Sequence, residues 1–295
     1  MDRFTSPLRY PGGKQQLAGY IKKIIEVNDF FDGIYVEPYA GGAGVALELL
    51  FSEYVRTIHL NDLDKNIYAF WYSVLFETEQ LISLISSTEA NLSNWEIYSS
   101  LISEPNIDIP LVQRGFATFF LNRCNRSGII SAGPIGGKNQ SGPWKIDARY
   151  NKRALAERIK LIARYRNSIH ISNMDCIDFL KSEKKILESK NYFIYLDPPY
   201  YNKGQQLYLN AYSHDDHVQL SDFLHSDFCN YNWIISYDAC LPVAQLYQDL
   251  RCTEQILNYS VTSNHKKGTE FVFYSNQIEI PEVASIIQPL VSMQV

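Results

Sequence analysis

Short apolar segments alternate with helical patterns near the start of the chain. Residues 33–38 form an apolar run that a proline ends, which predicts a strand. Apolar residues at helical spacing in 17–27 and 45–51 predict a helix on either side of it, and 56–60 predicts a second strand. Strand, turn, helix and strand in this order predict a βαβ unit, in which the two strands pair in parallel.

The middle of the chain lacks strand patterns. Apolar residues recur at helical spacing from residue 65 to about residue 109, and residues 152–165 predict a further, basic helix. Between them, 128–143 contains five glycines and is predicted to be a loop or a hairpin. Within the first part, three helices are predicted, over 67–76, 79–86 and 95–102.

Strand patterns return in the second half of the chain, at 168–172, 192–196 and 233–236. Residues 254–274 predict two more strands, joined by a hairpin turn at 264–268. We therefore expect an α/β fold, with a Rossmann-like core and an inserted helical and hairpin domain. The expected division assigns 1–64 and 166–295 to the core and 65–165 to the insert.

Charge changes this picture, because it is unevenly distributed. The chain of 295 residues has a net charge of −5, yet the stretch from residue 111 to residue 166 holds twelve basic residues and only two acidic ones. Such asymmetry indicates one region that faces a polyanion, on an otherwise acidic protein. Some of these bases are expected on the solvated face of the helix at 152–165. The favoured partner is nucleic acid.

Several classes of protein are not supported by the sequence. No run approaches 18 consecutive apolar residues, and the start of the chain lacks the apolar stretch of a signal peptide. Five scattered cysteines without a Cys-x-x-Cys pair predict a reducing, cytoplasmic setting without structural zinc. His214 and His217 resemble a metal pair, but Ser213 followed by two acids is more typical of a capped helix start, so no metal site is predicted.

The sharpest candidate site is Asp197-Pro198-Pro199-Tyr200, directly after the apolar segment 192–196. Ligands of open α/β sheets bind at the carboxyl ends of strands, so this position suits an active site. The exocyclic amine of a nucleobase is a poor nucleophile. The Asp197 side chain and the Pro198 carbonyl can accept its hydrogens, while Tyr200 offers a flat face to an extruded base. The alternative is a buried turn capped by Asp197.

A second candidate is the glycine-rich turn that follows Glu37, whose glycines allow close approach to a nucleotide. Glu37 would repel a pyrophosphate, which favours S-adenosylmethionine over a dinucleotide. Asp62 ends the next strand and can accept both hydroxyls of a ribose. Asp64 is a near alternative, and a helix cap at this point is compatible with either role.

Four stretches, in this order, resemble the Dam-type DNA adenine-N6 methyltransferases: SPLRYPGGK at residues 6–14, EPYAGGAG at 37–44, the strand end at Asn61-Asp62, and DPPY at 197–200. A terminal strand, EFVFYSN, adds to the resemblance, which spans nearly the whole chain. The resemblance implies a Rossmann-like methyltransferase core that binds S-adenosylmethionine, with a target-recognition domain between its two parts.

By resemblance, the cofactor residues are Tyr10, Lys14, Glu37, Asp62, Asp175 and Asp197, and the catalytic ones are Asp197, Pro198 and Tyr200. Asp175 is implied to bind the cofactor adenine; its alternative is a helix start. The implied DNA-binding residues are Arg9, Asn122, Arg123 and Arg126. Arg9 suits guanine O6 and N7, with a phosphate contact or plain surface as the alternative. Arg123 and Arg126 are alternatively partners in structural ion pairs.

The expected function is therefore methyl transfer to adenine N6 in double-stranded DNA, with base flipping. Cytosine-N4 methylation, RNA methylation and a catalytically dead DNA-binding module are the alternatives. The segment after Arg123 departs from the Dam type, which leaves the target sequence open. A cognate restriction endonuclease is one candidate partner, and a phage or solitary regulatory role fits equally well.

Overall fold

The computed structural model describes residues 6–9, 17–104, 108–188, 191–201, 212–261, 264–282, 286–287 and 289. These residues form two compact units. The first unit contains Asp62–Asn173, Gly41–Gly44 and residues 6–9. The second contains the described residues among 17–40, 45–61 and those from Met174 onward. The α/β class expected from the sequence is confirmed.

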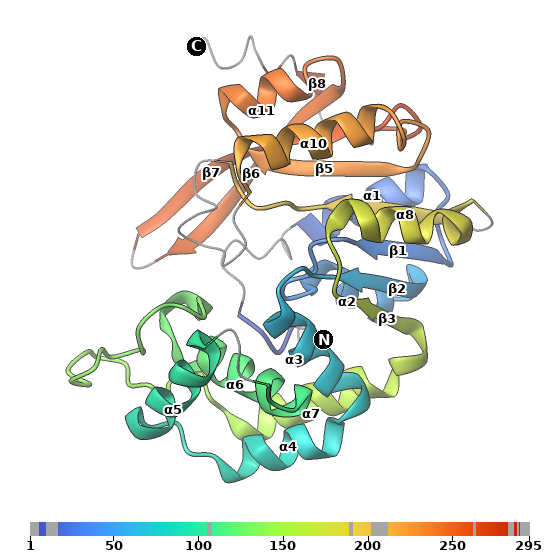
Figure 1. Cartoon of the computed structure of the whole chain (residues 1–295). Coiled ribbons are helices and arrows are strands. Elements are labelled where there is room, and N and C mark those ends of the chain that lie inside the picture. Colours follow the sequence, from blue (N-terminus) through green and yellow to red (C-terminus); the bar gives the residue numbers. More distant parts are fainter. Residues whose placement is uncertain are drawn as a thin grey trace. The chain divides into compact units, whose positions relative to one another are not determined.

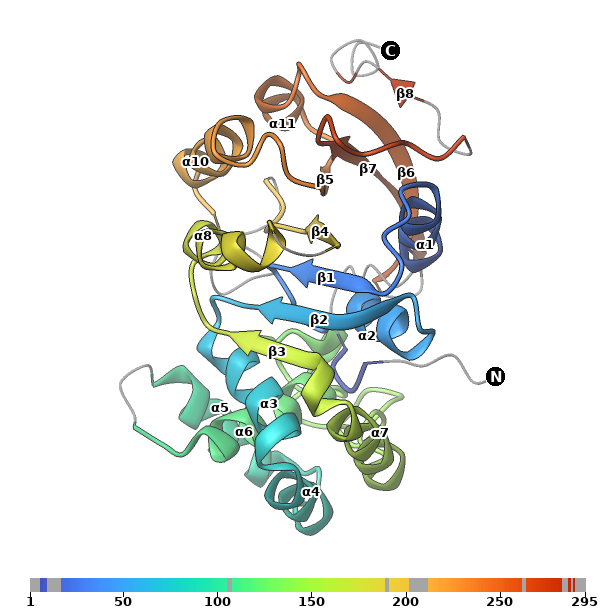
Figure 2. The ribbon, with the colours of Figure 1, turned by 90° about the vertical axis from the view of Figure 1, so that its right-hand side faces the viewer.

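A twisted sheet forms the second unit, with its strands in the order β2-β1-β4-β5-β7-β6-β8 (Figure 2). The first four strands in this order pair in parallel, whereas β7 runs antiparallel to both β5 and β6. The bounds of these strands are β1 Gly33–Glu37, β2 Val55–Asn61, β4 Tyr192–Leu196, β5 Trp233–Asp238, β6 Arg251–Val261, β7 Asn264–Tyr274 and β8 Ile286–Ile287.

Helices cover both faces of this sheet. Figure 2 shows α1 and α2 on one face and α8, α10 and α11 on the other. Every residue of β1 and β4 is buried, as expected of parallel strands covered on both sides. The bounds of these helices are α1 Ala18–Val27, α2 Gly44–Phe51, α8 Cys176–Leu187, α10 His214–His225 and α11 Leu241–Leu246.

The hairpin predicted near the end of the chain is present, but its predicted turn is wrong. Residues 264–268 belong to β7 and pair with 257–261 of β6, in a register that runs from Leu257↔Gly268 to Val261↔Asn264. Local turn propensity is thus outweighed by continued strand pairing. Figure 1 shows the resulting long ribbon of β6 and β7.

The first unit is mainly helical. Its elements are α3 Lys65–Phe76, α4 Thr78–Ser87, α5 Leu92–Ser103, α6 Leu111–Cys124, the short helix η2 Arg126–Gly128, α7 Lys152–Arg164, the short helix η3 Arg166–Ser168 and the strand β3 Ile169–Ser172. The helical pattern predicted α3, α4, α5 and α7. It missed α6, whose residues from Arg114 to Asn122 are all buried, so that no polar face marks a helical period.

Aromatic packing of α3 on α6 builds the core of this unit. The rings of Phe70 and Phe119 stack with centroids 5.8 Å apart. At Gly115, a Cβ atom would lie 2.4 Å from the Ala69 carbonyl oxygen and 2.3 Å from the Ser73 hydroxyl oxygen. Only glycine therefore allows the two helices to approach this closely.

Candidate functional site

The DPPY motif directly follows β4, in the second unit. Leu196 pairs with Ile235 in the parallel register of β4 and β5, so Asp197 stands next to Ser236. The Ser236 hydroxyl donates a hydrogen bond to Asp197 Oδ1 at 3.4 Å. Tyr195 and Ser236 join their hydroxyls at 2.9 Å. Burial is the main cause that raises the pKa of Tyr195 well above 10, so Tyr195 stays a neutral donor. The two hydroxyls thus form a donor chain that ends on Asp197.

The rest of the motif is held by two acids from neighbouring strands. The Tyr200 hydroxyl donates to Glu270 Oε1 of β7 at 2.6 Å, and the Tyr201 N–H donates to Asp238 Oδ1 of β5 at 2.9 Å. Tyr200 and Glu270 are buried, with 6% and 1% of their surfaces exposed. A short, buried hydrogen bond of this kind fixes the orientation of the ring. Little of that ring faces solvent, so its predicted stacking on a base stays a prediction.

Glu37 lies at the end of β1, beside β4 in the sheet. It is buried, with 5% of its surface exposed. Burial, followed by the carboxylates of Glu37 and Asp197, raises the pKa of Tyr35 well above 10. The two carboxylates therefore act on one phenol, which means that the ends of β1 and β4 bring together two residues that lie far apart in the sequence.

Asn61 belongs to the strand end Asn61-Asp62, but the sequence assigned a role only to Asp62. Its side chain donates to the carbonyls of Pro38 and Met174, both at 3.0 Å, and accepts the Met174 N–H at 3.0 Å. It thereby fixes the end of β1 against the segment before α8. The signal in the sequence that could have indicated this role is a polar residue at the end of an apolar strand.

Asp175 follows Met174 and caps α8, since its Oδ1 accepts the Ile177 N–H at 2.8 Å. The helix start that the sequence left as an alternative is therefore present. The residue is exposed, and burial, with a smaller contribution from the Asp175 carboxylate, raises the pKa of Tyr212. Tyr212 in turn shares a hydrogen bond of 2.8 Å with the Tyr39 hydroxyl, beside the glycine-rich turn. Whether Asp175 binds a cofactor stays a prediction.

Asp62 lies in the first unit, with the glycines of the turn. Its Oδ2 accepts the Gly41 N–H and its Oδ1 accepts the Asp64 N–H, both at 2.9 Å. Burial, followed by the Asp64 carboxylate, raises the pKa of Asp62 to about 7 against these two donors. Asp64 caps α3 through the Asn66 N–H. The cap is therefore Asp64, and Asp62 instead orders the glycine-rich turn.

Three expected DNA-binding residues of the first unit are Arg9, Arg123 and Arg126. Arg123 Nε donates to the Arg149 carbonyl at 2.7 Å, and Arg9 Nη1 donates to the Asn125 carbonyl at 3.1 Å. Burial, followed by the charges of Arg9, Arg158 and Arg149, lowers the pKa of Arg123 to about 10. These four arginines form a group that we call the arginine cluster: Arg9, Arg123, Arg149 and Arg158. Arg126 is exposed, and its guanidinium lies over Gly133.

Asn122 has a different place from the one expected of a DNA contact. Only 1% of its surface is exposed, and its amide accepts the Arg9 N–H at 2.7 Å and donates to the carbonyls of Arg9 and Gly128 at 2.7 and 2.8 Å. Gly128 has a φ of +78°, and a Cβ there would lie 2.3 Å from the Arg9 carbonyl oxygen. Asn122 therefore orders the backbone that carries Arg9, rather than facing a ligand.

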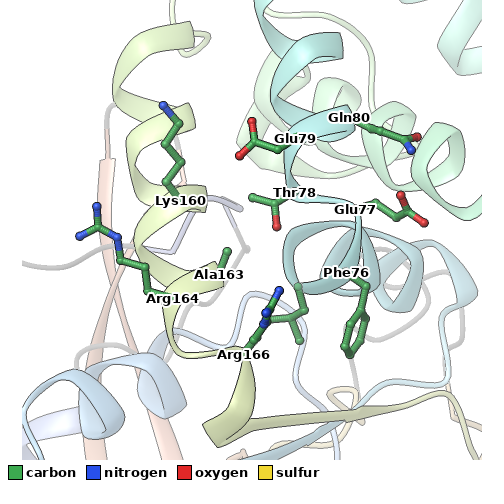
Figure 3. Close-up of a pocket in the computed structure, with 10 residues that line it drawn as sticks. Phe76, Glu77, Thr78, Glu79, Gln80, Lys160, Ala163, Arg164 and Arg166 are labelled. Atoms are coloured by element: carbon green, nitrogen blue, oxygen red, sulfur yellow. The ribbon is translucent and has the colours of Figure 1, made fainter.

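Other parts of the basic segment have structural or surface roles. Arg114 is buried and donates to Asn66 Oδ1 at 3.2 Å. A pocket between the start of α4 and the end of α7 is lined by charged side chains of both signs (Figure 3), among them Glu77, Glu79, Lys160 and Arg164. None of the predicted site residues lines it.

Tyr10 and Lys14 lie outside the described residues. Ser213 caps α10 in a reciprocal capping box with Asp216, as predicted. Among the described residues, no group of three His, Cys, Asp or Glu side chains is arranged to hold a metal ion. Within the same residues, no helix is long and apolar enough to cross a bilayer.

Comparison with known proteins adds one finding. The model of a family described as "D12 class N6 adenine-specific DNA methyltransferase" matches residues 10–264 of the chain. A search of curated proteins returned no match.

Proposed function

Since the chain belongs to the D12 class N6 adenine-specific DNA methyltransferases, we propose that it uses S-adenosylmethionine to methylate a flipped adenine in double-stranded DNA. The family acts as an enzyme on adenine N6 in DNA, which favours this activity over the cytosine-N4, RNA and catalytically dead alternatives. The observation that carries the residue-level proposal is the DPPY motif at the carboxyl end of β4, with Asp197 held by the Ser236 hydroxyl.

The chemistry of the candidate residues fits the proposed cofactor. Glu37, Asp62 and Asp175 supply carboxylate acceptors, which suit the hydroxyl and amino groups of a nucleoside with an amino acid attached and would repel a pyrophosphate. We propose that these three, with Tyr10 and Lys14, hold S-adenosylmethionine. When bound, this cofactor supplies an electrophilic methyl group.

The protein's own contribution is positioning and charge arrangement. Asp197 and the Pro198 carbonyl accept the two hydrogens of the adenine amine, which draws its nitrogen toward a tetrahedral geometry. The amine is itself the nucleophile, so no covalent enzyme intermediate is needed. The donor chain from Tyr195 through Ser236 keeps one carboxylate oxygen of Asp197 in place, and Tyr200 is the proposed stacking surface for the base.

We assign target recognition to 65–165 and catalysis to 1–64 and 166–295. Arg9, Arg123 and Arg126 are the proposed DNA contacts, with Asn122 ordering Arg9. The arginine cluster supports this assignment, because a bound phosphate would relieve the repulsion between its guanidinium groups. A cognate restriction endonuclease and a cytoplasmic location remain part of the proposal.

The variant Asp197→Ala tests the catalytic assignment. We expect methyl transfer to a mixed-sequence duplex to fall at least about 100-fold, because the acceptor for the amine is lost. Gel shifts are expected to show DNA affinity within about twofold of the wild type, since phosphate contacts, which Asp197 does not make, supply most of the affinity. Asp215→Ala removes an exposed acid from the same unit and is the control. Full residual activity of Asp197→Ala contradicts the role.

A further inference from the structure

Trp144 is the most exposed large apolar side chain in the described part of the chain, with 72% of its surface accessible. The chain has three other tryptophans, and all are buried: Trp71 at 2%, Trp95 at 8% and Trp233 at 1%. An indole costs free energy when it stands in water, and tryptophan is enriched at sites where proteins bind partners. A single exposed apolar residue is common on protein surfaces, so the role of Trp144 has to be inferred from the loop around it.

The loop that carries Trp144 is built by its own hydrogen bonds. The Gln140 side chain donates to the carbonyls of Ile135 and Gly137 at 2.8 and 2.7 Å, and it accepts the Ile146 N–H at 2.9 Å. Lys145 Nζ donates to the Gln140 carbonyl at 2.6 Å. These contacts fix the loop on both sides of Trp144.

Close backbone packing adds to this order. Gly136 has a φ of +84°, and a Cβ there would lie 2.7 Å from the Trp144 carbonyl oxygen. Two residues beyond Trp144, the side chain of Ile146 is buried at 5% exposure. An ordered loop thus has a buried anchor next to an exposed indole, which is the arrangement expected of a contact surface that is formed before binding.

The charges of the same loop identify the partner. Lys138, Lys145 and Arg149 are exposed there, and the one acid between residues 126 and 152 is Asp147. A flat aromatic ring among cations matches nucleic acid, whose phosphates attract the cations and whose bases and sugars offer surfaces for the ring. An acidic protein would match the same cations, but the proposed function already supplies DNA as the partner.

We propose that Trp144 contacts double-stranded DNA directly, by packing its indole against the sugar and base surface of the duplex. This inference rests on the proposed function, because DNA is the substrate there. It goes beyond that function by adding a binding residue outside the DPPY motif and the arginine cluster. Recognition by stacking tolerates many sequences, so Trp144 contributes affinity rather than choice of target.

Fluorescence quenching tests the proposal directly, because the three other tryptophans are buried. Acrylamide, which is uncharged, should quench the free protein mainly at Trp144. With a fluorescein-labelled duplex bound to saturation, as followed by anisotropy, we expect the quenching constant to fall to that of Trp144→Phe. An unchanged constant in a complex that anisotropy shows to be formed overturns the proposal. A wild-type protein that binds no duplex overturns the proposed function as well.

Affinity measurements give a second, independent readout. Trp144→Ala should weaken duplex binding about tenfold, while Trp144→Phe, which keeps a flat ring, should lose less. Binding of S-adenosylmethionine should not change. Ile97→Ala removes a side chain that is 59% exposed on α5 and serves as the matched control. Equal duplex affinity of Trp144→Ala, Ile97→Ala and the wild type contradicts the proposal.

Discussion

Around the DPPY motif, carboxylates receive hydrogen bonds from neutral donors of the protein. Asp197 accepts from Ser236, and Glu270 accepts from Tyr200. In the arginine cluster of the first unit, the guanidinium groups of Arg9 and Arg123 donate to backbone carbonyls instead. Arg123 donates to the carbonyl of Arg149, and burial followed by the neighbouring arginines lowers its pKa. One region orients its acids with neutral donors of the protein, whereas the other holds cations that repel one another.

This difference suits the two proposed tasks. A catalytic acceptor is effective when it is oriented before the substrate arrives, since reorganisation during the reaction adds to the barrier. A surface for a polyanion is effective when its charges are compensated only by that ligand, because binding then relieves the repulsion. The comparison leads to three predictions, which differ in the quantity that changes.

The largest effect is expected for Ser236→Ala. Loss of the hydroxyl leaves Asp197 Oδ1 without this donor, and a hydrogen bond as long as 3.4 Å contributes enough to lower kcat about 3- to 10-fold. The KM for S-adenosylmethionine and the melting temperature should stay close to those of the wild type. A buried serine elsewhere in the same unit provides the control: Ser221→Ala, which loses a hydrogen bond of 3.0 Å to the Leu246 carbonyl. An equal loss of kcat in both variants would show that Ser236 acts only through stability.

A smaller effect is expected for Arg158→Gln, at the arginine cluster. Removing this charge relieves repulsion of Arg123, so the melting temperature of the free protein should not fall. Duplex affinity should weaken, and the slope of log Kd against log salt should decrease by about one. Arg114→Gln is the contrasting variant, because Arg114 is buried against Asn66. It should lower the melting temperature and leave the salt slope unchanged. A lower salt slope with Arg114→Gln and a lower melting temperature with Arg158→Gln would contradict the distinction between the structural Arg114 and the DNA-binding cluster.

The smallest effect concerns Asp62, an acid that accepts two N–H groups although burial raises its pKa to about 7. Folding then favours the protonated form, because the ordinary value is about 3.9. Its contribution to stability is complete at low pH and is lost as pH rises toward and through 7. In cofactor-free protein, the melting temperature of the wild type relative to Asp62→Asn should therefore fall between pH 5 and pH 8. Parallel curves for the two proteins would count against a raised pKa.

Much of the fold could be predicted from the sequence, because β1 and β4 are short apolar runs and the helices α3, α4 and α7 carry clear periods. Glu37 and Asp197 were also expected at strand ends, where parallel pairing brings them together. The buried helix α6 could not be predicted, since its polar residues Arg114, Thr118 and Asn122 are buried with the apolar ones and leave no polar face with a helical period.

Contacts between residues far apart in the sequence also could not be predicted. Ser236, Glu270 and Asn61 act through partners that only strand register and tertiary packing bring close. Asn122 was expected to bind DNA because its stretch of the sequence resembles the Dam-type enzymes. In the structure, the Asn122 side chain instead bonds the backbone N–H and carbonyl of Arg9. Arg9 lies far away in the sequence, so a local pattern cannot predict this contact.

The most direct test of the central claim is made in cells. The wild type and Asp197→Ala would each be expressed in a bacterial host that lacks DNA methylation, and the genomic DNA sequenced by a method that detects N6-methyladenine. We predict one methylated motif with the wild type and none with Asp197→Ala. Unmodified adenine with a folded, cofactor-binding wild type, or equal methylation by both proteins, would contradict the account.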